Sequence, residues 1–395
     1  MMSDAPLYNL SPLLQLLVLG GAVAGLPLAW VLYKSRSANT AQRLRLLTWV
    51  TLFLTFDLVI FGAFTRLTDS GLGCPDWPGC YGHASPVGAA TQISLEQTAM
   101  PTGPVTFAKA WVEMIHRYLA SAVGALILIL TIWTWLRRAD THLSPWWPTF
   151  TLIWVCLQGA FGALTVTMKL FPAIVTLHLM GGIMLLVLLR LQSLHYASVG
   201  AKAEVVRMRL PSSLRWWWSI SLTLLTLQIA LGGWVSTNYA VLACTDFPTC
   251  QGSWWPPMDF QHGFSFWREL GETRGGEALP FTALTAIHYT HRLMAYLVLT
   301  VLGLLTWHLW KQPGQRTTAR WLLALLVLQL LTGLSNVVLQ WPLMAALAHT
   351  GGAAAIAVVL MAVPYPRRLE PTSVTAAIDE PASSLSPSYR TELSA

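Results

Sequence analysis

The sequence predicts an all-α integral membrane protein, built from two similar four-helix units and one extra N-terminal helix. Of its 395 residues, 54% are hydrophobic and only 10% are charged, whereas soluble domains carry about 25% charged residues. Apolar runs long enough to cross a bilayer recur along the chain. In addition, motifs in the first half return in the same order in the second half.

Nine apolar runs have the length and low charge of membrane-spanning helices. Their approximate ranges are 12–33, 46–66, 111–136, 147–168, 172–194, 216–237, 283–308, 319–340 and 343–363. The first run is not preceded by the basic residues of a secretory signal, and it is longer than the apolar core of such a signal. We therefore predict a membrane-spanning helix there. Segment 364–395 is rich in Ser, Pro and Ala, which predicts a disordered cytoplasmic tail.

The net charge of +7 does not indicate a nucleic-acid partner, because the basic residues gather in alternate loops. These residues are Lys34, Arg36, Arg43 and Arg45; Arg137 and Arg138; Lys202, Arg207, Arg209 and Arg215; Lys311, Arg316 and Arg320; and Arg367 and Arg368. The positive-inside rule makes these loops and the C-terminus cytoplasmic. The N-terminus and the long loops 67–110 and 238–282 are then outside. No mitochondrial transit peptide is visible, so we expect a bacterial plasma membrane.

Both outside loops carry a pair of cysteines, in "CPDWPGC" from Cys74 to Cys80 and in "CTDFPTC" from Cys244 to Cys250. Disulfides persist on this side of a membrane, so one disulfide in each loop is the simplest interpretation. A shared zinc site is the alternative, although the spacing differs from that of closely spaced zinc ligands. Whether the disulfides are structural or redox-active stays open. Cys156, within a helix, is predicted to be buried.

The two halves of the chain are related by an internal repeat. "GAFTRLTDSGLGCPDWPGCYG" from Gly62 matches "GGWVSTNYAVLACTDFPTCQG" from Gly232, and "EMIHRYLA" from Glu113 matches "HYTHRLMA" from His288. "LHLMGG" and "AHTGGA" then follow in the same order. A shared order at nearly fixed separation predicts duplication. Four helices in each unit give both units the same orientation, with a pseudo-twofold axis along the membrane normal.

These patterns divide the chain into five parts. Residues 1–45 hold the extra helix and a basic loop, 46–194 form the first four-helix unit, 195–215 form a cytoplasmic linker, and 216–363 form the second unit. The tail follows. A four-helix bundle is a common holder for a buried cofactor.

Five of the ten histidines lie within apolar runs: His116, His178, His288, His291 and His349. Ionisable residues inside a membrane are candidates for function. His116, His178, His291 and His349, two in each unit, are at similar distances along their helices. At a rise of 1.5 Å per residue, they lie roughly 10 Å from the outer boundary of the membrane. Such a pair suits the two axial positions of a haem iron, and a Gly-Gly pair after His178 and near His349 removes side-chain bulk there. Hydrogen bonding between helices is the alternative.

Three charged residues accompany these histidines. Arg117 and Arg292 could contact haem propionates, or they could extend to the interface or bind a backbone carbonyl. Glu113 shares a helix face with His116, and its equivalent in the second unit is His288. A carboxyl group in a membrane pocket resists ionisation, which suits proton handling. An ion pair with Arg117 or Arg66 is the alternative. The presence of Glu113 in the first unit, where the second unit has His288, suggests that the first unit performs chemistry and the second holds a cofactor.

Over about residues 46–363 the chain closely resembles the haem A synthase family, on the stretches quoted above and in their order. The resemblance implies that a ring methyl of haem O is oxidised to a formyl group by two successive hydroxylations. By resemblance, His291 and His349 are the ligands of a resident haem b, and His116 and His178 hold the substrate haem. Glu113 resembles the carboxylate that assists methyl oxidation. The extra helix and the tail lie outside the family's usual eight-helix core.

The resemblance also implies a haem O synthase as the donor of substrate and a haem-copper terminal oxidase as the recipient of product. An unidentified electron donor is also required. A dihaem b-type membrane cytochrome that only relays electrons is the alternative. It explains the four histidines and the duplication, but not the difference between Glu113 and His288. A haem carrier without catalysis is a third interpretation.

Overall fold

The computed structural model describes residues 11–199, 211–312 and 314–364, and its regular elements there are helices. Nine of the helices in these ranges are long and apolar enough to cross a membrane, in agreement with the nine predicted runs. They are α1 (Ser11–Lys34), α2 (Thr40–Leu67), α4 (Phe107–Leu136), α6 (Trp146–Thr167), α7 (Pro172–Val199), α8 (Ser212–Thr237), α10 (Phe281–Trp310), α11 (Arg316–Val338) and α12 (Leu343–Leu360). The protein is therefore a multi-pass membrane protein.

Some helix ends differ from the predicted ranges. α2 begins at Thr40 because Asn39 and Gln42 form a capping box, so Arg43 lies in the helix and not in the basic loop. Its guanidinium donates to the carbonyl oxygens of Ser35 and Ala38, which closes the turn between α1 and α2. α7 continues beyond the predicted linker start, to Val199. Most of the predicted linker and nearly all of the predicted tail lie outside the described residues.

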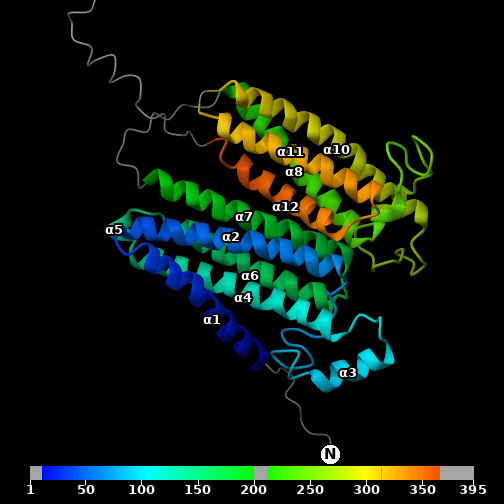
Figure 1. Cartoon of the computed structure of the whole chain (residues 1–395), viewed down its shortest axis with the longest axis horizontal. Helices are drawn as coiled ribbons and strands as arrows, with labels where there is room; N and C mark the ends of the chain where they lie inside the picture. Colours follow the sequence, from blue (N-terminus) through cyan, green and yellow to red (C-terminus); the bar gives the residue numbers. More distant parts are fainter. Residues whose placement is uncertain (1–10, 200–210, 313, 365–395) are drawn as a thin grey trace, which may run out of the picture.

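The long helices form two groups that run along the same direction (Figure 1). One group contains α1, α2, α4, α6 and α7, in which α2 packs on α4 and α7, and α6 packs on the same two helices. The other contains α8, α10, α11 and α12, in which α10 packs on α8 and α11, and α12 packs on α11 and α8. Contacts of α7 with α8 and α12, and of α2 with α12, join the groups.

Apolar cores lie within the first group and across the junction of the two groups. In the first group, Leu44, Leu126 and Tyr196 belong to a buried cluster that joins α1, α2, α4 and α7. A larger buried cluster contains Leu302 of the second group and also Leu186 of α7. Lipid tails are as apolar as these side chains, so the cores stabilise the helix contacts through van der Waals packing.

The extra helix α1 packs tightly against the first group. A Cβ atom at Gly20 would lie 2.4 Å from the Cβ of Ser121 on α4, so only glycine permits this approach. Near the start of α1, Leu16 joins a buried cluster with Cys74, Cys80 and Met114. α1 is therefore part of the structure around the first cysteine loop.

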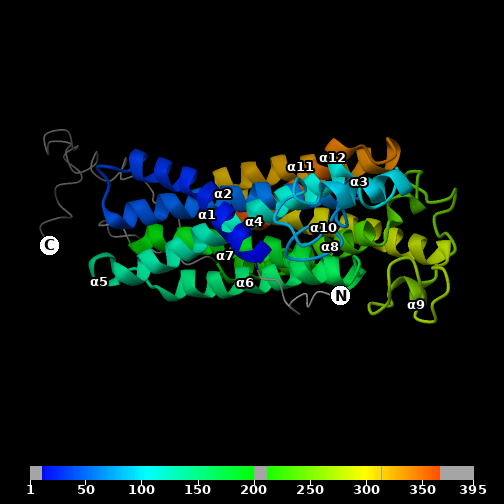
Figure 2. The ribbon, with the colours of Figure 1, turned by 90° about the horizontal axis from the view of Figure 1, so that it is seen from below.

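The two long loops lie at the same end of the helices, here named the cysteine-loop end (Figures 1 and 2). The first follows α2 and contains the short helix α3 (Ala90–Ala99). The second follows α8 and contains the 3-10 turn η1 (Ala240–Ala243) and α9 (Phe260–Gly263). Both cysteine motifs thus face the same side.

Candidate functional site

Each cysteine loop is closed by a disulfide. Cys74 bonds to Cys80 and Cys244 bonds to Cys250, with Cα–Cα distances of 4.9 and 4.8 Å, within the range of protein disulfides. The thiolates that a zinc site would require are therefore not available. The prediction for Cys156 is wrong, because its side chain is exposed on α6. A mid-helix position in a membrane protein can face lipid as readily as the core.

An aspartate braces each loop from within. Asp76 accepts hydrogen bonds from the backbone N–H groups of Tyr81 and Gly82 at 2.5 and 2.7 Å. Asp246 makes the equivalent contacts in the second loop. The Thr249 hydroxyl and these backbone N–H groups lower the pKa of Asp246 to about 2. Gly82 has a φ of +74°, a conformation that glycine adopts without strain. The shared aspartate of the two motifs is therefore a structural element of the turn.

Arg117 and Arg292 extend from α4 and α10 into these loops. Arg117 donates to the carbonyl oxygens of Asp76 and Pro78, each at 3.1 Å. Arg292 donates to the Thr249 carbonyl at 2.7 Å. Each guanidinium thus holds a cysteine loop against a helix through the carbonyl contacts that the sequence left as an alternative. A contact with haem propionates stays a prediction.

Glu113 lies on α4 and faces the first cysteine loop, with only 4% of its surface exposed. One carboxylate oxygen accepts from the Cys74 N–H at 2.8 Å, and the other forms an ion pair with Arg117. The ion pair considered from the sequence is therefore present. At the equivalent position, His288 Nδ1 lies 3.0 Å from the Ala240 carbonyl. Both residues anchor a loop, but only the first half places a carboxylate one helical turn from a histidine of a predicted pair.

The structure brings the predicted histidine pairs together. His116 on α4 and His178 on α7 are close enough to interact electrostatically, and so are His291 on α10 and His349 on α12. All four are partly accessible, although they lie well within long helices. Two imidazoles from different helices of one unit supply the two ligands that a bis-histidine haem site requires.

Each of these four rings packs against a glycine of a neighbouring helix. A Cβ atom there would lie within 3.5 Å of the imidazole Cε1, the glycine–histidine pairs being Gly62 with His116, Gly162 with His178, Gly232 with His291, and Gly333 with His349. The same arrangement recurs in both halves. These glycines make room for the rings, a role that the sequence alone did not reveal.

Glutamines fill the space beside the Gly-Gly pairs. A Cβ at Gly181 would lie 2.0 Å from Nε2 of Gln158, and one at Gly352 would lie 2.2 Å from Nε2 of Gln329. The Gln329 amide donates to the His349 carbonyl at 2.8 Å. The missing side-chain bulk at these glycines thus accommodates an amide, and in the second half that amide holds the backbone of a histidine.

The residues fit a haem better than a multidentate metal centre. Within residues 11–199, 211–312 and 314–364, no group of three or more His, Cys, Asp and Glu side chains could hold a metal ion. Paired imidazoles with glycine at their backs match the donor set of a porphyrin iron, which needs only two protein ligands.

Comparison with known proteins decides the family. Residues 45–361 match the model of the family described as cytochrome oxidase assembly protein, COX15-CtaA. The chain belongs to this family.

Proteins named heme A synthase are also similar over most of the chain. A protein of Shewanella oneidensis named heme A synthase is 39% identical over 81% of this chain and 96% of its own length. A heme A synthase of Methylobacterium nodulans is 30% identical over 75% of this chain and 84% of its own length. A heme A synthase of Alkalihalophilus pseudofirmus is 25% identical over 82% of this chain and 96% of its own length. The family match begins after α1, which agrees with the expectation that the extra helix lies outside the common core.

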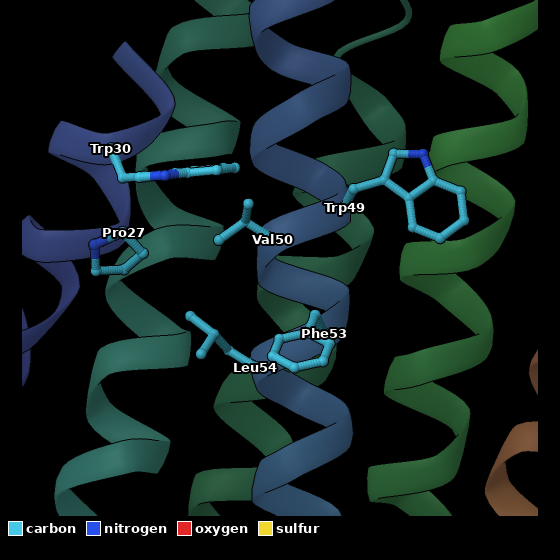
Figure 3. A pocket seen from close by; sticks show the side chains of 6 residues that line it. All are labelled: Pro27, Trp30, Trp49, Val50, Phe53 and Leu54. Atoms are coloured by element: carbon cyan, nitrogen blue, oxygen red, sulfur yellow. The ribbon is translucent and has the colours of Figure 1, made fainter. Parts of the chain in front are cut away.

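Two surface grooves of this family member were not predicted from the sequence. The first, about 410 Å³, lies between α1 and α2. Figure 3 shows its lining side chains, which are Pro27, Trp30, Trp49, Val50, Phe53 and Leu54. All are apolar or aromatic, and none is among the predicted site residues.

The second groove, about 360 Å³, lies between α2 and α12 and contains Asp57 with Phe61 and Leu347 among its lining residues. Phe61 also stacks on His116, with ring centroids 6.3 Å apart and planes inclined by 10°. Sequence reasoning missed Asp57, although an acidic residue within an apolar run is a signal for function. The groove therefore borders the first histidine pair.

The disulfides give a direct prediction for this protein. Alkylation of the unfolded protein without reductant should modify Cys156 alone, and reduction beforehand should expose all five cysteines. Intact-mass spectrometry before and after reduction measures the difference. Cys156 is the internal control for reagent access. Alkylation of Cys74 or Cys244 without reductant would contradict both the pairing and the outside location of the loops.

Proposed function

We propose that this chain is a membrane haem A synthase, which oxidises a ring methyl of haem O to a formyl group. Its family and its relatives named heme A synthase support the activity. One observation carries the proposal. Each four-helix unit contains a pair of imidazoles, and the two units differ in the residue one helical turn before the first histidine of the pair. Glu113 lies one turn before His116, whereas a histidine, His288, lies one turn before His291.

We infer that the chain contains two four-helix units, 46–194 and 216–363, related by a pseudo-twofold axis. The helix contacts support this, because α2, α4, α6 and α7 pack in the same order as α8, α10, α11 and α12. Equivalent residues also meet where the units join. Arg66 donates to the carbonyl of its equivalent Ser236 at 2.6 Å, and Asp69 accepts from its equivalent Tyr239 at 2.7 Å. Such contacts are expected near a twofold axis.

In this proposal His291 and His349 hold a resident haem b, and His116 and His178 hold the substrate haem. An iron porphyrin supplies the oxidising chemistry when it is bound, and the protein supplies position and proton paths. The chain's histidines would bind the porphyrin iron, and the apolar helices would exclude water from it. Arg117 and Arg292 lie one residue beyond His116 and His291, from which they could also contact propionates.

Glu113 is the group we assign to proton transfer during methyl oxidation. Each hydroxylation would take one oxygen atom from dioxygen and reduce the other to water, with two electrons from the external donor and two protons. Loss of water from the gem-diol would then give the formyl group, so protons are moved in both hydroxylations and in the dehydration. A carboxylate held by the Cys74 N–H and by Arg117 has a fixed orientation, as general-base catalysis requires.

The membrane arrangement completes the proposal. The cysteine-loop end faces outward from a bacterial plasma membrane, the N-terminus lies outside and the C-terminus lies in the cytoplasm, as the distribution of basic residues indicates. A haem O synthase supplies the substrate, and a haem-copper terminal oxidase receives the product. An electron donor of unassigned identity is required.

The alternative, a dihaem b-type cytochrome that relays electrons, does not account for Glu113 in one half only. Cells that make haem O separate the two functions. Extracted pigments should contain haem A when the chain is present and only haem O and haem B when it is absent. An unchanged pigment profile would reject the enzyme and leave the electron relay.

A further inference from the structure

The two imidazole pairs differ in what the ring nitrogen Nδ1 contacts. In the second half, His349 Nδ1 lies 3.0 Å from the Thr332 hydroxyl, and His291 Nδ1 lies 3.2 Å from the Gln228 amide. In the first half, both Nδ1 atoms are buried and contact no donor or acceptor among the described residues. When Nε2 binds iron, Nδ1 is the nitrogen through which the protein orients the ring.

The contact between Thr332 and His349 has a defined direction. The Thr332 hydroxyl donates its hydrogen to the Leu328 carbonyl at 2.7 Å, the usual bond of threonine to the preceding helical turn. Its oxygen therefore accepts from the Nδ1–H of His349. This contact places the proton on Nδ1 and leaves the Nε2 lone pair free for a metal ion.

Gln228 approaches His291 from the neighbouring helix α8. Its amide nitrogen lies 3.2 Å from His291 Nδ1 and 3.2 Å from the His291 carbonyl, while its Oε1 is buried without a partner. The amide nitrogen also lies 3.5 Å from Nε2 of the same ring. Because it donates to the His291 carbonyl, Gln228 holds His291 from the neighbouring helix through both its backbone and its ring.

The first half has apolar residues at both equivalent positions. The glycines that pack on the histidines fix the correspondence, and the equivalent pairs are Leu58 with Gln228 and Phe161 with Thr332. Neither Leu nor Phe can donate or accept a hydrogen bond. The contrast between the halves is thus encoded by two substitutions on the helices beside the histidines.

We propose that Thr332 and Gln228 are positioning residues that make the second half the site of permanent haem binding, whereas Leu58 and Phe161 leave the first half exchangeable. The proposal deepens the function assigned above and depends on it. A substrate must enter and leave, so imidazoles without a fixing hydrogen bond suit the first site. A resident cofactor must stay, and outer hydrogen bonds typically contribute about 10- to 100-fold to metal affinity.

The hydrogen bonds also affect the electrons on iron. An imidazole whose N–H donates to an oxygen is a more basic ligand, and it stabilises the oxidised iron more than the reduced iron. Hydrogen bonding of this kind is one means by which proteins set haem potentials. The second-half haem should therefore have a lower reduction potential than it would have without Thr332.

The test uses a His178→Ala background, in which the second pair alone can bind haem by two histidines. Thr332→Val keeps the side-chain shape and removes the acceptor oxygen. We expect haem to pass to excess apomyoglobin about 10 to 100 times faster, and the reduction potential to rise. Thr332→Ser should restore both values. Thr300→Val is the matched control, because Thr300 makes the same backbone bond on an exposed face of α10.

The reciprocal variant tests the first half. Phe161→Thr in a His349→Ala background should slow the loss of haem from His116 and His178. An unchanged transfer rate and an unchanged potential in Thr332→Val, with its haem spectrum retained, would overturn the proposal. None of these measurements depends on haem A formation, so failure of the proposed function would be detected separately, in the pigment assay.

Discussion

Replacement of His349 by alanine should remove the low-spin haem spectrum of the resident site. His349 and His291 come from α12 and α10 and lie close enough to interact, so loss of either leaves the porphyrin iron with one protein ligand. Absorption and electron paramagnetic resonance spectra of the purified variant measure the effect. We expect loss of nearly all bis-histidine signal from that site, and the same result for His291→Ala.

The first pair provides the control for this prediction. His116→Ala and His178→Ala should leave the resident spectrum in place and reduce haem O binding instead. His308→Ala, near the opposite end of α10 from the cysteine loops, should change neither. If the His116 pair alone controlled the resident spectrum, our assignment of the two halves would be reversed.

The second large effect is expected for Glu113→Gln. Glutamine can still accept from the Cys74 N–H, so the loop contact is preserved while the carboxylate is lost. General acid–base groups typically contribute about 100- to 10,000-fold to rate, and we expect haem A formation to fall by a factor in this range. Haem content should stay near that of the unmodified protein, because Glu113 is not a ligand in this proposal.

Comparison of glutamine with alanine separates chemistry from structure at this position. Glu113→Ala should lose activity and also loosen the first cysteine loop, because the Cys74 N–H then lacks its acceptor. Glu96→Gln on α3, which removes a carboxylate from the same loop region, should leave turnover unchanged. Full haem A production by Glu113→Gln would remove this carboxylate from the mechanism.

The membrane helices and the cysteine pairs could be predicted because their signals are local. Long apolar runs are read from a window of sequence, and paired cysteines in outside loops indicate disulfides. The histidines and Glu113 stood out because an ionisable side chain within an apolar run is rare. The structure places these residues as expected, although their roles toward haem stay predictions.

The partners of these residues could not be predicted, because they come from helices distant in sequence. Thr332 is an ordinary helical threonine until α11 packs on α12 and brings it to His349. Gly333 becomes important for the same reason. The exposure of Cys156 could not be predicted either, because the sequence does not indicate which face of α6 is exposed.

The most direct test of the account is the haem content of the purified full-length chain, before and after addition of haem. We predict a Soret band with the spectrum of bis-histidine low-spin haem, held by His291 and His349, and further uptake by the His116 pair. A colourless protein that develops no Soret band after haem is supplied would contradict the account.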